Sequence, residues 1–187
     1  MSKLEIRLDV AGLGRLHNAL VAAGHRAPLA LARAINHTGP KARTQMIRAL
    51  VPQTGLKRKV MVKALKETRA SPGSLSYSIK SAGGNVRLKF FSARETRRGV
   101  SAAPWNARRV YPGTFIKGGR FPKRVGLGKG GQVFQRVGSG RLPIKNVKSG
   151  LFIPTEMVSG ASAAAFNTVV NRDLPGRLSH ELARLFG

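Results

Sequence analysis

The fold is decided by the stretch LARAINHTGPKARTQMIRAL, residues 31–50. Its apolar residues recur every three or four positions, which predicts a helix with one buried face. Gly39-Pro40 interrupts this pattern, because Pro40 has no N–H to donate and disfavours helical geometry at Gly39. The stretch is therefore either two helices, 28–37 and 40–50, or one kinked helix, and we favour the kinked helix. The predicted apolar face comprises Leu29, Ala32, Ile35, Ala42, Met46, Ile47 and Leu50.

A strand and a short helix are predicted before this stretch. Aliphatic and charged residues alternate from Leu4 to Val10, as in a half-buried strand. A helix over 13–23 follows, and Gly24 is placed to end it in the left-handed conformation. Pro28 suits the first turn of the next helix. The apolar side of the short helix would be Leu13, Leu16, Leu20 and Ala23.

After the stretch, Val51-Pro52-Gln53 is predicted to end the long helix. Thr54 is a good N-cap for a third helix, from Gly55 to about Glu67. That helix is basic, and its charged side is either a solvated face or a DNA contact. Its basic residues are Lys57, Arg58, Lys59, Lys63 and Lys66.

The remainder of the chain predicts strands and then helices. Residues 75–79 and 86–90 indicate an antiparallel hairpin around Gly83-Gly84-Asn85. Thr155 would cap a helix that begins near Pro154, and Asp173 would cap a last helix over 174–186. Further strands are expected at 110–116, 132–137 and 147–153.

These elements predict an α+β fold, in which N- and C-terminal helices pack on a small, mostly antiparallel sheet. The length of 187 residues fits a single domain, residues 1–187. Within it, 1–91 would hold the N-terminal strand, helices and hairpin. Residues 92–150 would form a basic, glycine-rich arm with short strands, and 151–187 the last strand end and the C-terminal helices.

The composition is strongly basic. The chain has 34 Lys and Arg against 7 Asp and Glu, a formal charge of +27, and no Cys. Such a charge requires a polyanion, acidic partners or an assembly that spreads it. The missing Cys excludes disulfides, Cys-based zinc sites and thiol catalysis. The apolar runs are far shorter than the ~20 residues of a membrane span, and the N-terminus carries no signal-peptide pattern, so we expect no membrane association.

Basic residues concentrate between Arg94 and Lys148, where 14 stand beside one acid, Glu95. This segment is either a solvated, mobile loop or an arm that becomes ordered on meeting a partner. With the third helix, it supplies the candidate contacts to nucleic acid or to an acidic partner. They are Lys57, Arg58, Lys59, Lys63, Arg94, Arg97, Arg98, Arg108, Arg109, Lys117, Arg120, Lys123, Arg124 and Lys129.

Residue patterns for catalysis are missing. The four His residues are isolated, and the closest carboxylate pair, Glu5 and Asp9, would face water on a strand. Gly126–Gly131 matches GxGxxG, but a strand rather than a helix is expected after it, so we interpret it as loop. Trp105, Tyr77 and Tyr111 are scattered; Tyr111 and Phe115 either stack on bases or pack in the core or an interface, so base-specific recognition is weakly supported. We therefore expect no enzyme activity, no cofactor and no metal.

Six segments in a fixed order resemble the minor tail protein Z family, the tail completion proteins of long-tailed bacteriophages. The resemblance spans nearly the whole chain, and its specificity lies in order, spacing and basicity. The segments are LARAINHTGPKARTQM (31–46), TGLKRKVMVKAL (54–65), PGTFI (112–116), VFQRV (133–137), RLPIKNVKSG (141–150) and DLPGRLSHELARLF (173–186).

This resemblance implies a structural virion protein, made in the host cytoplasm, at the head-proximal end of the tail. It implies a homo-oligomer, a hexameric ring, that meets the tail terminator and head–tail connector proteins. The genome's double-stranded DNA end and the tape measure protein would be neighbours. The alternative is a cellular DNA- or RNA-binding protein of ribosomal or nucleoid type, which explains the charge but not the ordered segments.

Overall fold

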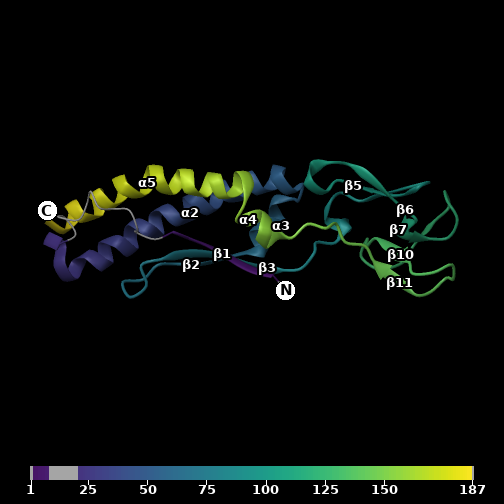
Figure 1. The fold of residues 1–187 in the computed structure, drawn as a ribbon, viewed down its shortest axis with the longest axis horizontal. Coiled ribbons are helices and arrows are strands. Elements are labelled where there is room, and N and C mark those ends of the chain that lie inside the picture. Colours follow the sequence, from purple (N-terminus) through teal and green to yellow (C-terminus); the bar gives the residue numbers. More distant parts are fainter. Residues whose placement is uncertain (1, 9–20, 187) are drawn as a thin grey trace.

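A computed structural model describes residues 2–8 and 21–186. The molecule is elongated, with a helical body at one end and a β-rich arm at the other (Figure 1). We call residues 92–150 the arm and the other described residues the body. Helices and small antiparallel sheets make up the chain, so the predicted α+β class is confirmed.

Two long helices form the upper layers of the body. Helix α2 (Ala27–Thr54) begins at the end of the molecule where α5 (Gly160–Phe186) finishes, and the two pack along each other in opposite directions (Figure 1). Their buried side chains face each other, and α2 also packs against the sheet below, as helical spacing of apolar residues requires. From α2 these include Ala34, Ile35, Ala42, Met46, Ile47 and Leu50, and from α5 Phe166, Val169, Leu174, Leu178 and Leu182.

A three-stranded antiparallel sheet, in the order β1-β3-β2, lies under α2. Its strands are β1 (Ser2–Leu8), β2 (Leu65–Thr68) and β3 (Tyr77–Gly83). Ile6 of β1 and Glu67 of β2 both stand opposite Ile79 of the central strand. The predicted N-terminal strand is therefore confirmed over residues 2–8.

Gly39 is the point of closest approach between α2 and this sheet. A Cβ added at Gly39 would lie 2.6 Å from the ring of Tyr77, and both residues are buried. The two-helix alternative for Gly39-Pro40 is wrong, because α2 runs unbroken from Ala27 to Thr54. The glycine marks a packing contact rather than a helix boundary, and Pro40 is accommodated inside the helix.

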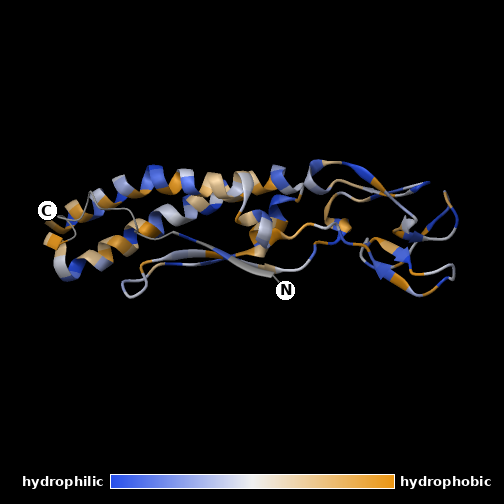
Figure 2. Cartoon of the chain, viewed as in Figure 1, coloured by the Kyte–Doolittle hydropathy of each residue, from blue (hydrophilic) through white to orange (hydrophobic). Residues whose placement is uncertain are grey.

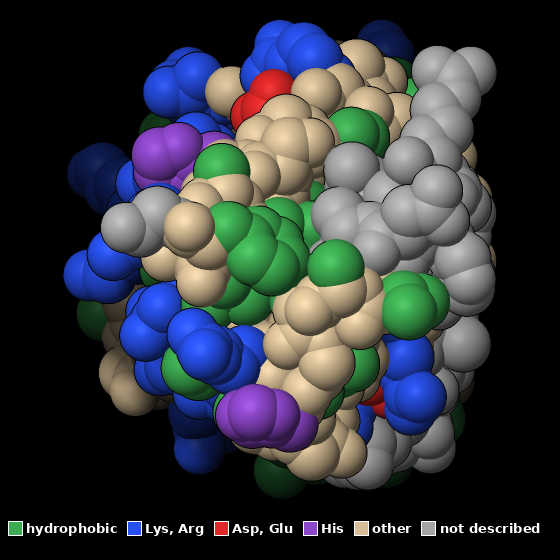
Figure 3. Space-filling view, turned by 90° about the vertical axis from the view of Figure 1, so that its left-hand side faces the viewer, with side chains coloured by type: hydrophobic (Ala, Val, Ile, Leu, Met, Phe, Trp, Pro, Cys, Tyr) green, Lys and Arg blue, Asp and Glu red, His purple; other side chains and the backbone are tan. Residues whose placement is uncertain are grey.

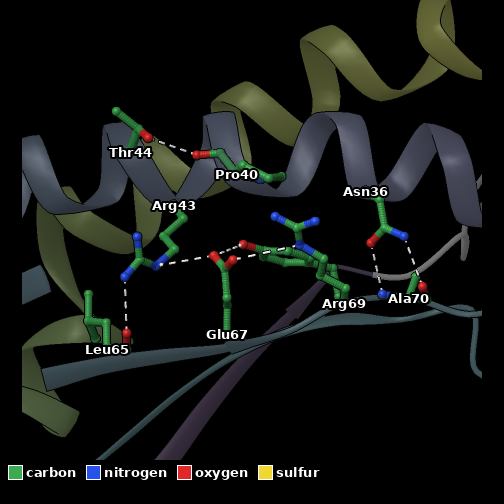
Figure 4. Close-up of polar contacts among 9 residues, drawn as sticks. Asn36, Pro40, Arg43, Thr44, Leu65, Glu67, Arg69 and Ala70 are labelled. Atoms are coloured by element: carbon green, nitrogen blue, oxygen red, sulfur yellow. Dashed lines mark hydrogen bonds and ion pairs between the residues drawn. The ribbon is translucent and has the colours of Figure 1, made fainter. Parts of the chain in front are cut away.

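Polar contacts join the same helix to β2 and to the residues that follow it (Figure 4). The Asn36 side chain donates to the Ala70 carbonyl at 2.8 Å and accepts from the Ala70 N–H at 2.9 Å. The Tyr77 hydroxyl donates to Glu67 at 2.6 Å, and Arg43 Nε lies 3.5 Å from the same carboxylate. Burial and the Glu67 carboxylate raise the pKa of Tyr77.

The end of α2 and the third helix differ from the prediction. Val51-Pro52-Gln53 does not end α2, and Thr54 is its last residue rather than an N-cap. Gly55 closes the helix with a φ of +76°, its N–H donating to the Val51 carbonyl at 2.9 Å. The third helix, α3 (Arg58–Ala64), begins later and finishes earlier than expected, because residues 65–68 pair with β3 instead.

The predicted 75–79 and 86–90 hairpin is wrong. Residues 77–79 of the first run belong to β3, whose partners are β1 and β2, and Leu88–Phe90 is a 3-10 turn, η3. The Val86 and Leu88 N–H groups donate to the carbonyls of Leu151 and Val147. Their partners thus come from a segment about sixty residues away, which local alternation does not reveal.

The C-terminal helices also differ in their bounds. A short helix, α4 (Ile153–Met157), precedes α5, which runs through Pro175 without a break. Asp173 is therefore inside α5 and is not a cap, and the N-cap of α4 is Phe152 rather than Thr155. Instead of the strand predicted at 147–153, Lys148 makes an isolated bridge to Arg87.

Most of the predicted helix over 13–23 lies outside the described residues. Gly24 does have a left-handed φ, +49°, and begins a 3-10 turn, η2 (Gly24–Arg26), before α2. Around this end of the body, Lys, Arg and His side chains surround exposed apolar ones (Figure 3). Phe186, 60% exposed, is among the apolar residues there.

The arm holds three small antiparallel sheets, with strand orders β4-β5-β6, β11-β10-β7 and β8-β9. It is ordered as strands and turns rather than as one loop. The expected strands at 110–116 and 132–137 are present in shorter form. The strands are β4 (Arg94–Thr96), β5 (Gly99–Ala102), β6 (Arg109–Pro112), β7 (Thr114–Phe115), β8 (Lys117–Gly118), β9 (Val125–Gly126), β10 (Phe134–Arg136) and β11 (Ile144–Asn146).

A latch of polar contacts joins the arm to the body at η4 (Pro104–Asn106). The Trp105 indole N–H donates to Glu156 Oε1 at 2.8 Å, and the Asn106 side chain donates to the Pro52 carbonyl at 2.8 Å. Gln53 donates to the other Glu156 oxygen, Oε2, at 2.8 Å. The Glu156 carboxylate therefore connects the arm with the end of α2.

Candidate polyanion interface

Charge is unevenly divided between the two regions. The arm has 14 basic residues and one acid, a net +13 in 59 residues. The rest of the chain has 20 basic residues and six acids, a net +14 in 128 residues. The charge density of the arm is therefore about twice that of the rest, and hydrophilic residues are interspersed with hydrophobic ones along it (Figure 2).

A hollow of about 340 Å³ in the arm collects five of these cations. The β4–β5 hairpin, the turn before β7 and strand β8 form its sides, with Gly99, Gly113, Gly118 and Gly119 among the lining residues. We call it the arginine cleft. Its cations are Arg97, Arg98, Lys117, Arg124 and Arg136.

The hairpin loop presents Arg97 and Arg98 to this cleft. Thr96 pairs with Gly99, so the two arginines are the whole loop, and both are exposed. A Cβ on Gly99 would lie 2.1 Å from the Tyr111 carbonyl oxygen, and the φ of Gly99 is +143°. Only glycine allows β5 to approach β6 this closely, so Gly99 sets the position of the loop.

The one acid of the arm is committed to internal contacts. Arg124 Nη1 donates to Glu95 Oε1 at 2.5 Å, and the same oxygen accepts from the Ile116 N–H at 3.2 Å. The Glu95 side chain is 11% exposed, and the Arg124 side chain 21%. Glu95 thereby orients Arg124 beside the cleft while cancelling one of its five charges.

Aromatic rings support two guanidinium groups of the cleft. Arg124 lies 5.9 Å from the ring centroid of Phe121, and Arg136 5.6 Å from that of Phe115. Arg136 also donates to the carbonyls of Gly140 and Arg141, at 3.1 and 2.7 Å. Contacts of this kind hold the planar groups in place.

Arg136 was missed by sequence reasoning, which placed it in a strand but not among the contacts. Alternation gave no signal for it: residues two apart on a strand share a face, yet Phe134 is buried and Arg136 is exposed. The pairing of Phe134 with Phe115 on β7 brings β10 to the cleft. That pairing spans 19 residues of sequence and is not visible locally.

Other predicted contacts lie outside the arginine cleft. On the β4-β5-β6 sheet, Arg108 donates to the Ser101 hydroxyl at 3.2 Å, and Arg109 donates to the Tyr111 hydroxyl at 2.7 Å. Further exposed cations of the arm are Arg120, Lys123 and Lys129.

Two further hollows connect the arm with α3. One, of about 650 Å³, is lined by Arg94, Lys117 and Phe90 together with Lys89 and Glu95. The next, of about 460 Å³, is mostly apolar, and Phe90 lies in it beside Lys59, Val60, Lys63 and Ala64. Lys117 lines both the arginine cleft and the first of these hollows, and Phe90 lines both further hollows, so the three follow one another from the cleft to α3. Lys57 and Arg58 are exposed at the start of α3.

The remaining motifs have structural surroundings. Tyr77 is part of the core, and Tyr111 accompanies Arg109. Residues 126–131 leave β9 as turns, and the strand β10 follows, unlike a dinucleotide-binding motif. Within the described part of the chain, no three His, Asp or Glu side chains gather in a way that could hold a metal ion.

No helix among residues 2–8 and 21–186 combines the length and apolar content of a membrane span. Comparison of the chain with protein-family models, curated protein sequences and solved structures found no match. The site is therefore interpreted from its own chemistry. Exposed guanidinium groups around an open polar hollow are suited to bind phosphates or carboxylates.

Proposed function

We propose that this chain is a structural phage protein that completes the tail at its head-proximal end. In this proposal it forms a homo-oligomeric ring, a hexamer, between the tail terminator and the head–tail connector, near the end of the double-stranded genome. The tape measure protein is a further neighbour, and the role is structural rather than catalytic. The ordered segments that resemble the tail completion family support this assignment.

The observation that carries the proposal is the arm. Five of its apolar side chains are buried, namely Val100, Ala102, Pro104, Val133 and Phe134, while its charge is +13. It also exposes large apolar side chains, and this mixture is typical of surfaces that meet other molecules. Those exposed side chains are Trp105, Val110, Phe121, Val125, Leu127, Val137 and Leu142.

Electrostatics favours an anionic neighbourhood for any ring of this chain. Six copies at +27 each carry +162. Such a ring is destabilised by self-repulsion unless DNA or acidic proteins compensate it. A neck position beside packaged DNA supplies that compensation.

The test is localisation of the chain in particles from the virus or prophage that encodes it. Immunogold electron microscopy with antibodies against the chain should label the junction of head and tail. Fractionation of the host cell should place it with tails and virions. Label confined to ribosomes or nucleoid would overturn the proposal in favour of a cellular nucleic-acid-binding protein.

A second test addresses the contribution of the arm. Neutralising Arg97, Arg98, Arg108 and Arg109 together should lower the number of infectious particles and the salt dependence of DNA binding. The body should keep its thermal stability, because all four side chains are exposed. Unchanged infectivity and unchanged salt dependence would reject a DNA role for the arm.

A further inference from the structure

We infer that the arginine cleft is a phosphodiester-binding site that holds the sugar–phosphate backbone of duplex DNA without regard to base sequence. This inference rests on the proposed contact between the arm and a polyanion, and it assigns that contact to five of the arm's side chains.

The first argument is local charge. Arg97, Arg98, Lys117, Arg124 and Arg136 surround one open hollow, and Glu95 compensates a single charge through Arg124. Neither Arg97 nor Arg98 makes a hydrogen bond or ion pair with another side chain among the described residues. Their guanidinium donors are therefore available to a ligand. An anion with several oxygens relieves the repulsion among these groups and accepts their N–H donors.

The second argument is the residue type. Four of the five cations are arginines, whose planar forked donors match phosphate geometry better than a lysine ammonium does. Phe115 and Phe121 lie beside the guanidinium groups of Arg136 and Arg124 and limit their rotation. Glycines line much of the remaining wall, so a phosphate group can approach the protein backbone closely.

The third argument separates backbone contact from base recognition. Single-stranded nucleic acids are held largely by aromatic rings on which bases stack. The one aromatic residue that lines the cleft, Phe115, is half-buried, with Arg136 over its ring and Phe134 at a centroid distance of 6.2 Å. Phosphate contacts position a duplex but carry no sequence information. Duplex DNA is therefore the favoured ligand.

The experiment measures binding of a short fluorescent DNA duplex to the full-length chain by anisotropy, over a range of salt concentrations. The variant R97A/R98A removes two cations of the cleft. Its log–log salt slope should fall by about 1.8, since each phosphate contact contributes about 0.9. A second duplex of shuffled sequence should bind the unaltered protein equally well.

The matched control is K145A/K148A, which removes the same charge from exposed positions of the same arm outside the cleft. Its slope should fall by less than half as much. R97K/R98K keeps the charge but loses the forks, so it should retain the slope and lose affinity. R108A/R109A, whose guanidinium groups contact Ser101 and Tyr111, should have a smaller effect than R97A/R98A.

Equal falls in the salt slope for R97A/R98A and K145A/K148A would overturn the inference, because diffuse charge alone predicts equal falls. Tighter binding of single-stranded DNA or RNA than of the duplex would also overturn it. Trp105 emission and thermal unfolding establish that each variant is folded. If the arginine cleft does not bind DNA but the immunogold label still lies at the phage neck, only this inference fails and the proposed function stands. DNA binding at the cleft with no label at the neck would refute only the proposed function.

Discussion

The body and the arm are built on different physical principles. In the body, α2, α5 and the β1-β3-β2 sheet contain most of the buried apolar side chains of the described chain. In the arm, short strands are held by tight turns, glycine contacts and the Glu95–Arg124 pair. The body is therefore stabilised mainly by apolar burial, and the arm keeps an open charged surface that such burial would remove.

This difference predicts that stability and anion binding respond to separate sets of substitutions. Changes in the body should alter global unfolding, and changes in the arm should alter DNA affinity with little effect on the body. The following substitutions test that separation, beginning with the largest expected effect.

Gly39→Ala should cause the largest loss of stability. The new Cβ would meet the Tyr77 ring at 2.6 Å between two buried elements, so α2 and β3 must move apart. We expect a loss of about 1–3 kcal/mol or more in the free energy of unfolding, measured by urea denaturation. The control is Gly176→Ala in α5, where nothing lies within 4 Å of the added Cβ. It should be stabilising, by about 0.5–1 kcal/mol. If both substitutions change the free energy of unfolding in the same direction, the packing role of Gly39 is refuted.

Gly99→Ala should disturb the arm and its DNA binding while leaving the stability of the body unchanged. The Cβ would overlap the Tyr111 carbonyl oxygen, at 2.1 Å, and displace the Arg97–Arg98 loop. We expect about a tenfold loss of duplex affinity, which corresponds to about 1.4 kcal/mol. Helical circular dichroism should report an unchanged unfolding midpoint. Gly138→Ala, in open space, should leave both quantities unchanged. If the unfolding midpoint of the helical signal falls as much as it does for Gly39→Ala, the arm and the body unfold as one cooperative unit.

Glu156→Ala should uncouple the two regions. It removes the carboxylate that accepts from the Trp105 N–H and the Gln53 side chain, while Gln53 keeps its bond to the Glu156 carbonyl at 3.0 Å. The expected cost is about 1 kcal/mol, accompanied by a red shift of the Trp105 emission as the indole becomes more exposed to water. Asp173→Asn is the control, because Asp173 pairs with its neighbour Arg172 on the surface of α5. An unchanged emission spectrum would show that this latch does not set the position of the arm.

His37 should produce the smallest effect, confined to the body. Desolvation lowers its pKa, and Lys41 and Arg177 lower it further against the opposing carboxylates Glu181 and Asp173. The unfolded chain therefore binds the proton more readily, and stability falls as the pH drops below the ordinary His value of about 6.5. His37→Gln should remove this pH dependence. The free energy of unfolding should then change between about pH 5 and about pH 8 by an amount that differs from the unaltered protein by no more than about 0.5 kcal/mol, measured in thermal melts. Identical pH profiles for the two proteins would contradict it, and duplex affinity at about pH 8 should be unchanged.

Local patterns predicted what depends on neighbouring residues. Alternation placed the strand at residues 2–8, and helical spacing placed the apolar face of α2 except at Leu29, which is 42% exposed. Proline and glycine were misleading where tertiary contacts compensate for them. Both α2 and α5 continue through a proline, and Gly39 serves the Tyr77 contact rather than a helix end.

The sequence by itself determined the α+β class, the concentration of positive charge in residues 92–150 and the residue types able to bind an anion, because composition and short-range periodicity encode these. Only the tertiary structure decided which cations meet. It places Arg97, Arg98, Lys117 and Arg124 around one hollow with Arg136, and it directs Arg108 and Arg109 to the neighbouring sheet. The physical reason is that strand pairing and glycine contacts between distant segments set these positions, and such long-range contacts leave no local periodic signal.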